Sequence, residues 1–297
     1  MGCKIIIKDT NKMMDSKMNI CIQGLKKFEE IKIILETNCF YNINAPMNWS
    51  ENTFWQSEAI FLSDSNGIVS LEKSPSIGGD YTGIRSMGLF ESLKAVTIVN
   101  KKHIGDLKHL PLNDVVSYKI SVLSDEKLLA KTTFNRFYKK NNINHYDIQR
   151  DSWQGRVFYE ESKNKKPAII VLSGSDGGIE KAQNIAMMLS NQGFVTLAIS
   201  YFGMNNQKSN LDRIPLENLE EALKYIQKLD FVNSTKIGIY GRSKGAEYSL
   251  LFLTKYDGIK CAVLNSPINI QQSITEQLKK NNAMKMQSYK GKAVKPL

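Results

Sequence analysis

From about Trp153 onward, short apolar runs alternate with segments of helical periodicity, and this alternation limits the fold more than any other feature of the chain. Strands are predicted at Ala168–Leu172, Phe194–Ile199, Lys236–Tyr240 and Cys261–Leu264. Helices are predicted between them: one carries Ala182, Ile185, Ala186 and Leu189 at helical spacing and can end at Gly193, one begins at Pro215, and one runs from Lys244 to about Lys255. Strands alternating with helices predict an α/β domain with a parallel sheet over residues 153–297.

The first 140 residues have a different pattern, in which short β-rich segments are separated by turns. Strands are predicted at Asn19–Ile22, Ile31–Leu35, Phe54–Leu62, Asp114–Leu123 and Leu128–Tyr138. Within one of them, Val116, Tyr118, Ile120 and Val122 alternate with more polar neighbours, as in a half-buried strand. Since no long helical pattern occurs here, residues 1–140 are predicted to form an immunoglobulin-like β-sandwich, followed by a polar linker at 141–152.

The composition is that of a globular protein. Hydrophobic residues make up 42% of the 297 positions, which excludes disordered and collagen-like chains. A membrane-spanning helix is not expected, because the sequence has no run of about 18 apolar residues. The four cysteines show neither paired nor metal-like spacing. They indicate free thiols in a cytoplasmic protein, and we expect neither a metal nor another cofactor.

The net charge of +11 needs a separate explanation, because strongly basic chains often bind nucleic acids. Only six of the 40 basic residues are arginines, and the lysines are spread along the sequence. This distribution favours a solvated surface over a nucleic-acid interface.

In a parallel sheet, ligands bind at the carboxyl ends of the strands. One predicted strand ends in Gly241-Arg242-Ser243-Lys244-Gly245, a G-x-S-x-G sequence with a strand before it and a helix after it. This context is typical of a nucleophile elbow, in which the serine occupies a strained turn. Glycine is expected at positions 241 and 245, because a side chain at either position would collide with the turn. Ser243 is therefore the predicted catalytic nucleophile.

Backbone N–H groups near Ser243 can stabilise an oxyanion. The N–H of Lys244 lies at the predicted start of a helix, and the Gly-rich loop 173–178 can add a second donor, from Ser175 or Asp176. The same loop could cradle a phosphate, but it lacks the Lys-Ser/Thr end of a P-loop, and the sequence has no G-x-G-x-x-G. Nucleotide binding is therefore disfavoured.

With these motifs in place, the sequence resembles the type I acyl-CoA thioesterases and bile acid-CoA:amino acid N-acyltransferases over nearly its whole length. The matching segments are Gly24-Leu25, Phe54–Gly67, Gly79–Gly83 through Leu89, Val171–Gly178, Ala198–Gly203, Ile214–Glu217, Gly241–Glu247 and Ser288–Lys292. The resemblance implies an N-terminal sandwich followed by an α/β-hydrolase domain. It also implies an acyl-CoA as substrate, with hydrolysis to free acid and CoA or transfer of the acyl group to an amino acid.

The elbow residue favours one of these two reactions. In the family, the amidating members resemble one another in carrying Cys at the elbow, whereas the thioesterases carry Ser, as this chain does at Ser243. An ester on serine is lost to water without a special acceptor. The prediction is an acyl-CoA thioesterase; an N-acyltransferase, a general carboxylesterase and a catalytically silent acyl-CoA-binding protein remain as alternatives.

A triad of this fold runs in the order Ser, acid, His, and no histidine follows Ser243. The three histidines, His103, His109 and His145, all precede it. Among the acids after the elbow, Glu247, Asp257 and Glu276 are poorly placed for a triad. We therefore expect a hydrolase domain that lacks its last strands, as in a C-terminally truncated family member, and a chain that is inactive in this short form. A genuine short binding protein, or a homo-oligomer supplying His145 in trans, would be alternative explanations.

The lysines between 279 and 295 face one acid, Glu276, and form a basic tail. This tail could bind the phosphates of coenzyme A, but a tail that is simply exposed to solvent is favoured.

Overall fold

The computed structural model describes residues 2–8, 11–38, 40, 45, 49–100, 104–267, 287–289 and 292–293. The contacts divide the chain into two compact units. The first consists of Met1–Lys102 and Asn113–Tyr138, and the second of His103–Leu112 and Lys139–Leu297.

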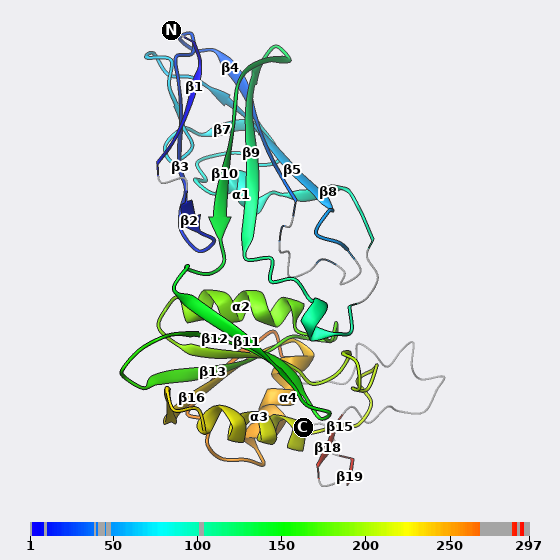
Figure 1. The fold of residues 1–297 in the computed structure, drawn as a ribbon. Coiled ribbons are helices and arrows are strands. Elements are labelled where there is room, and N and C mark those ends of the chain that lie inside the picture. The colour runs from blue at the N-terminus through cyan, green and yellow to red at the C-terminus, as the bar shows by residue number, and fades with distance from the viewer. Residues whose placement is uncertain are drawn as a thin grey trace, which may run out of the picture. The chain divides into compact units, whose positions relative to one another are not determined.

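The first unit is built from sheets whose strands carry apolar side chains on one face. Its larger sheet has the order β2-β10-β9-β4-β5-β7, with β8 also paired to β5 (Figure 1). The strands are β2 (Asn11–Met13), β4 (Glu30–Thr37), β5 (Phe54–Leu62), β7 (Ser76–Gly79), β8 (Lys94–Thr97), β9 (Val115–Ser124) and β10 (Lys127–Phe137). A smaller sheet joins β1 (Lys4–Lys8), β3 (Asn19–Gln23) and β6 (Val69–Ser70).

Alternation along these strands produces the core of the first unit. In β4, Ile31, Ile33 and Leu35 are fully buried while the residues between them are half-buried. The short helix α1 (Gly88–Glu91) adds Leu89 and Phe90 to the buried residues. The all-β sandwich predicted for the N-terminal part is confirmed.

The second unit is an α/β structure around one six-stranded sheet of order β11-β12-β14-β13-β16-β17. Its strands are β11 (Ile143–Gln149), β12 (Gln154–Glu160), β13 (Lys166–Leu172), β14 (Val195–Ser200), β16 (Val232–Arg242) and β17 (Cys261–Asn265). The last four in sequence are parallel, whereas β12 runs antiparallel to β14 and β11 antiparallel to β12. This arrangement confirms the predicted α/β-hydrolase fold class.

Three helices cover this sheet: α2 (Glu180–Ser190), α3 (Glu217–Gln227) and α4 (Lys244–Leu253). Figure 1 shows α2 on one face and both α3 and α4 on the other. The second unit also holds a 3₁₀ turn, η1 (Leu107–His109), and a small sheet of β15 (Ile214–Pro215), β18 (Gln287–Tyr289) and β19 (Lys292–Ala293). Pro215 was predicted to open a helix, but it lies in β15, and α3 begins two residues later.

Two further expectations differ from the structure. The stretch 141–152, predicted as a linker, contains β11, an edge strand of the second sheet. Most of its side chains are exposed, and that polar pattern resembles a linker in the sequence. Residues 103–112, predicted within the sandwich, belong to the second unit. Leu107 and Leu110 are buried there against Ile179 and Met204, and the buried Arg156 donates to the carbonyl oxygens of both leucines.

Candidate active site

Ser243 is the single residue between the end of β16 and the start of α4, and its backbone has a conformation that residues with a side chain rarely adopt. Its φ is 51° and its ψ is −121°. Such a conformation in a non-glycine residue costs on the order of 1–3 kcal/mol and persists only where the surroundings hold it. Here the Ser243 N–H donates to the Asn265 carbonyl at 2.9 Å, and the Ser243 carbonyl accepts from Ala246 N at 2.9 Å and Glu247 N at 3.1 Å. These bonds fix the strained turn from both sides.

The two glycines of the G-x-S-x-G sequence lie where no side chain fits. A Cβ on Gly241 would lie 2.5 Å from the Gly245 carbonyl oxygen and 2.7 Å from Ser249 Oγ. A Cβ on Gly245 would lie 2.2 Å from the Ser173 carbonyl oxygen. The close approach of α4 to β13 and β16 therefore depends on both glycines.

The loop after β13 lies directly beside Ser243. A Cβ added to Gly174 would be 3.1 Å from Ser243 Cβ and 3.5 Å from Ser243 Oγ. The loop turns back through a bond from Gly177 N to the Gly174 carbonyl at 3.4 Å, so Ser175 and Asp176 occupy the two central turn positions. The two sequence segments predicted to form the site are thus brought together.

Tyr201 ties this loop to the sheet. Its hydroxyl donates to the Ser173 carbonyl at 3.1 Å, and its ring stacks on Tyr248 with 4.7 Å between centroids. Burial raises the pKa of Tyr201 above the ordinary value of 10.0, with smaller contributions from Glu247 and Asp176. The hydroxyl is therefore a neutral donor at physiological pH. Sequence reasoning placed Tyr201 at a strand end but assigned it no role.

The predicted oxyanion donors differ in their surroundings. Lys244 is the first residue of α4, and its N–H is among those that a helix leaves without an internal acceptor. Ser175 and Asp176 are exposed, and within the described ranges their N–H groups donate no hydrogen bond. All three backbone groups are therefore available to a ligand.

Two ion pairs border the site, and sequence reasoning predicted neither of them. The buried Lys244 side chain lies 3.0 Å and 2.9 Å from the two Glu247 carboxylate oxygens. Lys181, near the start of α2 and also buried, lies 2.8 Å from Asp176 Oδ2. Since Lys181 precedes the helical apolar stripe, nothing in the sequence pattern marks it as a partner of the loop.

The histidines lie elsewhere. His145 is on β11, four strand positions from β16, which corresponds to roughly 19 Å at the usual strand spacing. His109 is exposed in η1, 3.3 Å from Asp106. His103 and Glu276 lie outside the described residues, as do the tail lysines Lys279, Lys280, Lys285, Lys290 and Lys295, whereas Lys292 belongs to β19. In the described ranges, no imidazole reaches Ser243.

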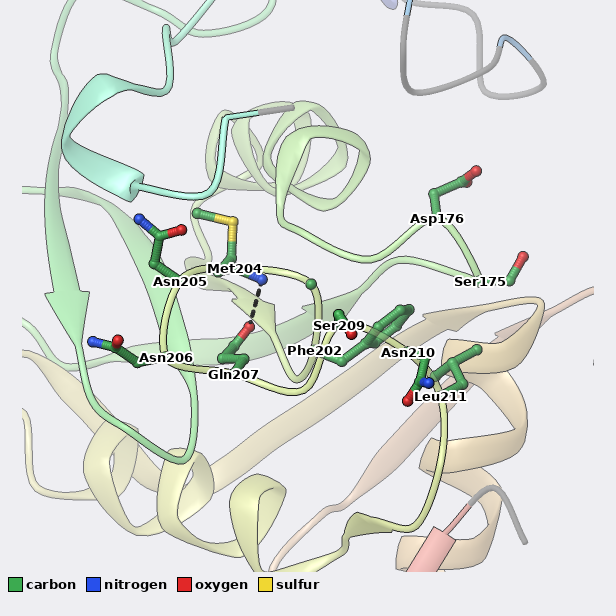
Figure 2. Close-up of a pocket in the computed structure, with 11 residues that line it drawn as sticks. Ser175, Asp176, Phe202, Met204, Asn205, Asn206, Gln207, Ser209, Asn210 and Leu211 are labelled. Atoms are coloured by element: carbon green, nitrogen blue, oxygen red, sulfur yellow. Dashed lines mark hydrogen bonds between the residues drawn. The ribbon is translucent and has the colours of Figure 1, made fainter. Parts of the chain in front are cut away.

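A pocket of about 640 Å³ opens beside the same loop (Figure 2). Ser175 and Asp176 form part of its wall, and residues 202–207 and 209–211, after β14, form the rest. Within the described part of the chain, no cluster of three or more His, Cys, Asp or Glu side chains could hold a metal ion. No helix there is long and apolar enough to cross a membrane.

A largely parallel sheet with a strained serine between a strand and a helix defines the α/β-hydrolase class. Two family models then match the sequence: the acyl-CoA thioester hydrolase/BAAT N-terminal region at residues 15–150, and the BAAT/acyl-CoA thioester hydrolase C-terminal region at residues 214–295. The chain belongs to this acyl-CoA thioester hydrolase/BAAT family.

Curated relatives carry both activities of the family in their names. Acyl-coenzyme A amino acid N-acyltransferase 1 of Mus musculus is 29% identical over 84% of this chain, and bile acid-CoA:amino acid N-acyltransferase of the same organism is 26% identical over 88%. Acyl-coenzyme A thioesterase 2, mitochondrial, of Homo sapiens is 23% identical over 84%. The matches span 58%, 61% and 49% of these relatives. Among solved structures, the α/β hydrolase GrgF of Penicillium is 16% identical, with a TM-score of 0.39 over 46% of this chain and 50% of that one.

Proposed function

We propose that the protein cleaves acyl-CoA thioesters, with Ser243 as the residue that takes up the acyl group. The main support for this proposal is the strained backbone of Ser243. Such strain costs free energy and is found mostly at functional sites, and here it holds the serine at the carboxyl edge of the sheet, where a nucleophile is expected. Ser243 Oγ would attack the thioester carbonyl, its proton and the departing coenzyme A thiolate would leave as the free thiol, and water would then cleave the serine ester.

The developing oxyanion would be held by backbone donors. The N–H of Lys244 supplies one at the helix start, and Ser175 or Asp176 supplies the second. The position of Gly174 supports this assignment, since a Cβ added there would lie only 3.1 Å from Ser243 Cβ, and Ser175 and Asp176 follow directly in the same loop.

Water is the proposed acyl acceptor, because the elbow residue is Ser243, the residue that thioesterases of this family carry. Transfer to an amino acid is the second candidate. It is favoured by the two N-acyltransferases described above, which are 29% and 26% identical to this chain, against 23% for the thioesterase. Adding glycine or taurine to the reaction and analysing the product for an N-acyl conjugate separates the two.

Turnover by the 297-residue chain is expected to be slow, because its sequence holds no histidine after Ser243. Oxyanion stabilisation and binding alone leave about 10³-fold acceleration over water. A silent acyl-CoA-binding protein and a general carboxylesterase are the competing functions; the first binds palmitoyl-CoA without releasing thiol, and the second prefers short p-nitrophenyl esters.

The test combines palmitoyl-CoA binding with a thiol-release assay on the full chain and on Ser243→Ala. We expect saturable binding by both and slow thiol release by the unmodified chain only. Ser234→Ala, at an exposed position of β16, is the matched control and should release thiol normally. Equal release by Ser243→Ala would show that another group takes up the acyl chain.

The cytoplasm is the proposed compartment. Cys3, Cys21 and Cys261 are free thiols, which is compatible with a reducing environment. A homo-oligomer, in which a second copy could supply His145, remains a prediction. Sedimentation of the purified chain tests it.

A further inference from the structure

Residues 104–112, which we call the strap, belong to the second unit although the chain on both sides of them belongs to the first. The first unit consists of Met1–Lys102 and Asn113–Tyr138, so the strap leaves the sandwich and returns to it. The sandwich chain therefore contributes a segment to the unit that carries Ser243.

The strap contacts the loop that follows β14, which is one wall of the pocket. The Gly105 carbonyl accepts from Asn205 N at 2.6 Å, and a Cβ on Gly105 would lie 2.2 Å from Asn205 Oδ1. Met204, which lines the pocket, packs in one apolar cluster with Leu107 and Leu110 of the strap. Figure 2 shows Met204 and Asn205 beside the pale cyan ribbon of the strap. The strap thus holds this loop at two neighbouring residues.

The loop after β14 is in turn bonded to the Gly-rich loop 173–178. Gly178 N donates to the Phe202 carbonyl at 3.0 Å, and a Cβ on Gly203 would lie only 3.1 Å from Gly178 N. The proposed second oxyanion donor lies two or three residues before Gly178 in the same loop. A shift of the loop after β14 would therefore move this donor as well.

One buried guanidinium joins the strap to two other elements. Arg156, on β12, donates from Nη2 to the carbonyls of Leu107 and Leu110, each at 3.3 Å. Its Nε donates to Asp147 Oδ1 on β11 at 2.6 Å, and its Nη1 donates to Gln183 Oε1 on α2 at 2.8 Å. A buried guanidinium is stable only where its donors are paired. Without the strap, Nη2 would keep only its bond to Asp147.

Gln183 extends these contacts along the strap. Its Nε2 donates to the carbonyls of Pro111 at 3.1 Å and Leu112 at 3.4 Å. Gln183 is buried, and it lies in the first turns of α2, the helix that follows the Gly-rich loop. Arg156 and Gln183 together therefore bond to four strap carbonyls.

We propose that Arg156 and Gln183 are positioning residues for the reaction at Ser243, and that they act through the strap. They hold the strap, the strap holds the loop after β14, and that loop holds the Gly-rich loop beside Ser243. The inference rests on the proposed function, in which the Gly-rich loop supplies an oxyanion donor. It adds that a segment of the sandwich chain supports the active site.

The test uses Arg156→Met in the full chain, because methionine keeps an apolar stem and removes the guanidinium. Two quantities are measured where the variant is folded: hydrogen exchange of the Asn205 and Gly178 N–H groups by NMR, and thiol release at saturating palmitoyl-CoA. Both amides should exchange about tenfold faster, because the loop after β14 opens more easily without the strap. Thiol release should fall by up to about 10²-fold, the loss that a displacement of about 1 Å can cause.

Val157→Ala is the matched control. Val157 follows Arg156 on β12, is fully buried, and packs on the opposite face of the sheet in the core with α3. This variant should also lower the stability in urea, but exchange at Asn205 and Gly178 and thiol release should keep the values of the unmodified chain. An equal loss of thiol release in both variants would mean general destabilisation and would overturn the positioning role.

The outcomes separate this inference from the proposed function. If Arg156→Met leaves exchange at both amides unchanged, or releases thiol at the unmodified rate, the positioning role is wrong and the proposed function stands. If the unmodified chain itself releases no thiol, the proposed function fails, and the positioning role fails with it. If Arg156→Met does not fold, Gln183→Met decides by the same two measurements, because it removes two strap contacts and keeps the ion pair between Arg156 and Asp147.

Discussion

The two turns at the carboxyl edge of the second sheet are built in opposite ways. The turn from β16 into α4 is crowded and strained: a Cβ added to Gly241 or Gly245 would collide with backbone oxygens, and Ser243 is held at φ 51°. The loop from β13 to α2 is open, and its central residues Ser175 and Asp176 are exposed. The first turn fixes one side chain in space, whereas the second presents backbone N–H groups and leaves room for a ligand. The difference predicts which substitutions each turn tolerates.

The largest effect on stability is expected for Gly245→Ala in the crowded turn. Its Cβ would lie 2.2 Å from the Ser173 carbonyl oxygen, so α4 must move, at a cost of about 3 kcal/mol. The free energy of unfolding in urea measures this cost. Gly193→Ala is the control. Gly193 has φ 89° but open space around it, so this variant should lose only the stability that the left-handed backbone conformation costs an alanine, about 1–2 kcal/mol. A smaller loss for Gly245→Ala than for Gly193→Ala would contradict the crowding account.

In the open loop, the backbone N–H should matter and the side chain should not. Ser175 is the second residue of the turn, a position where proline fits, so Ser175→Pro removes the N–H and keeps the loop. If Ser175 supplies the second oxyanion donor, thiol release should fall by about 10²–10³. Ser175→Ala should release thiol at the unmodified rate. If Ser175→Pro released thiol at the normal rate, Ser175 would not be the second oxyanion donor, and Asp176 would be the remaining candidate.

Tyr201 connects the two turns, and its hydroxyl should contribute modestly. Tyr201→Phe loses the bond to the Ser173 carbonyl and should cost about 1 kcal/mol at pH 7. Because burial raises the pKa of Tyr201, its contribution is complete below pH 10 and is lost as the pH rises above that value. Urea unfolding at pH 7 and above pH 10 should therefore show the difference between the two proteins shrinking. A constant difference would mean that the hydroxyl is not the buried donor described here.

The smallest effect compares two replacements of Ser243. Glycine adopts φ 51° without strain, so Ser243→Gly should be about 1 kcal/mol more stable than Ser243→Ala, while neither releases thiol. Thermal unfolding of the two variants checks this order. Equal stabilities would mean that the turn stores no strain.

The crowded turn could be predicted from the sequence because its chemistry is local. Gly241, Ser243 and Gly245 need only a strand before them and a helix after them, and both were visible in the apolar pattern. The open loop could be located, but not its partners: Tyr201 and Lys181 reach it through tertiary packing, which has no sequence period. The segment of β11 is predicted as a linker for a related reason. An exposed edge strand buries few side chains, so its sequence shows no clear alternation of apolar and polar residues.

The most direct test of the central claim is the covalent state of Ser243 after incubation with palmitoyl-CoA. The missing histidine slows both steps, but an oxygen ester on serine is less reactive than a thioester, so loss of the acyl group should be the slower step and an acyl-enzyme should accumulate. Mass spectrometry of the digested chain should find a palmitoyl group on the peptide that contains Ser243, and none in Ser243→Ala. A palmitoyl group on another residue, with Ser243 unmodified, would contradict the account.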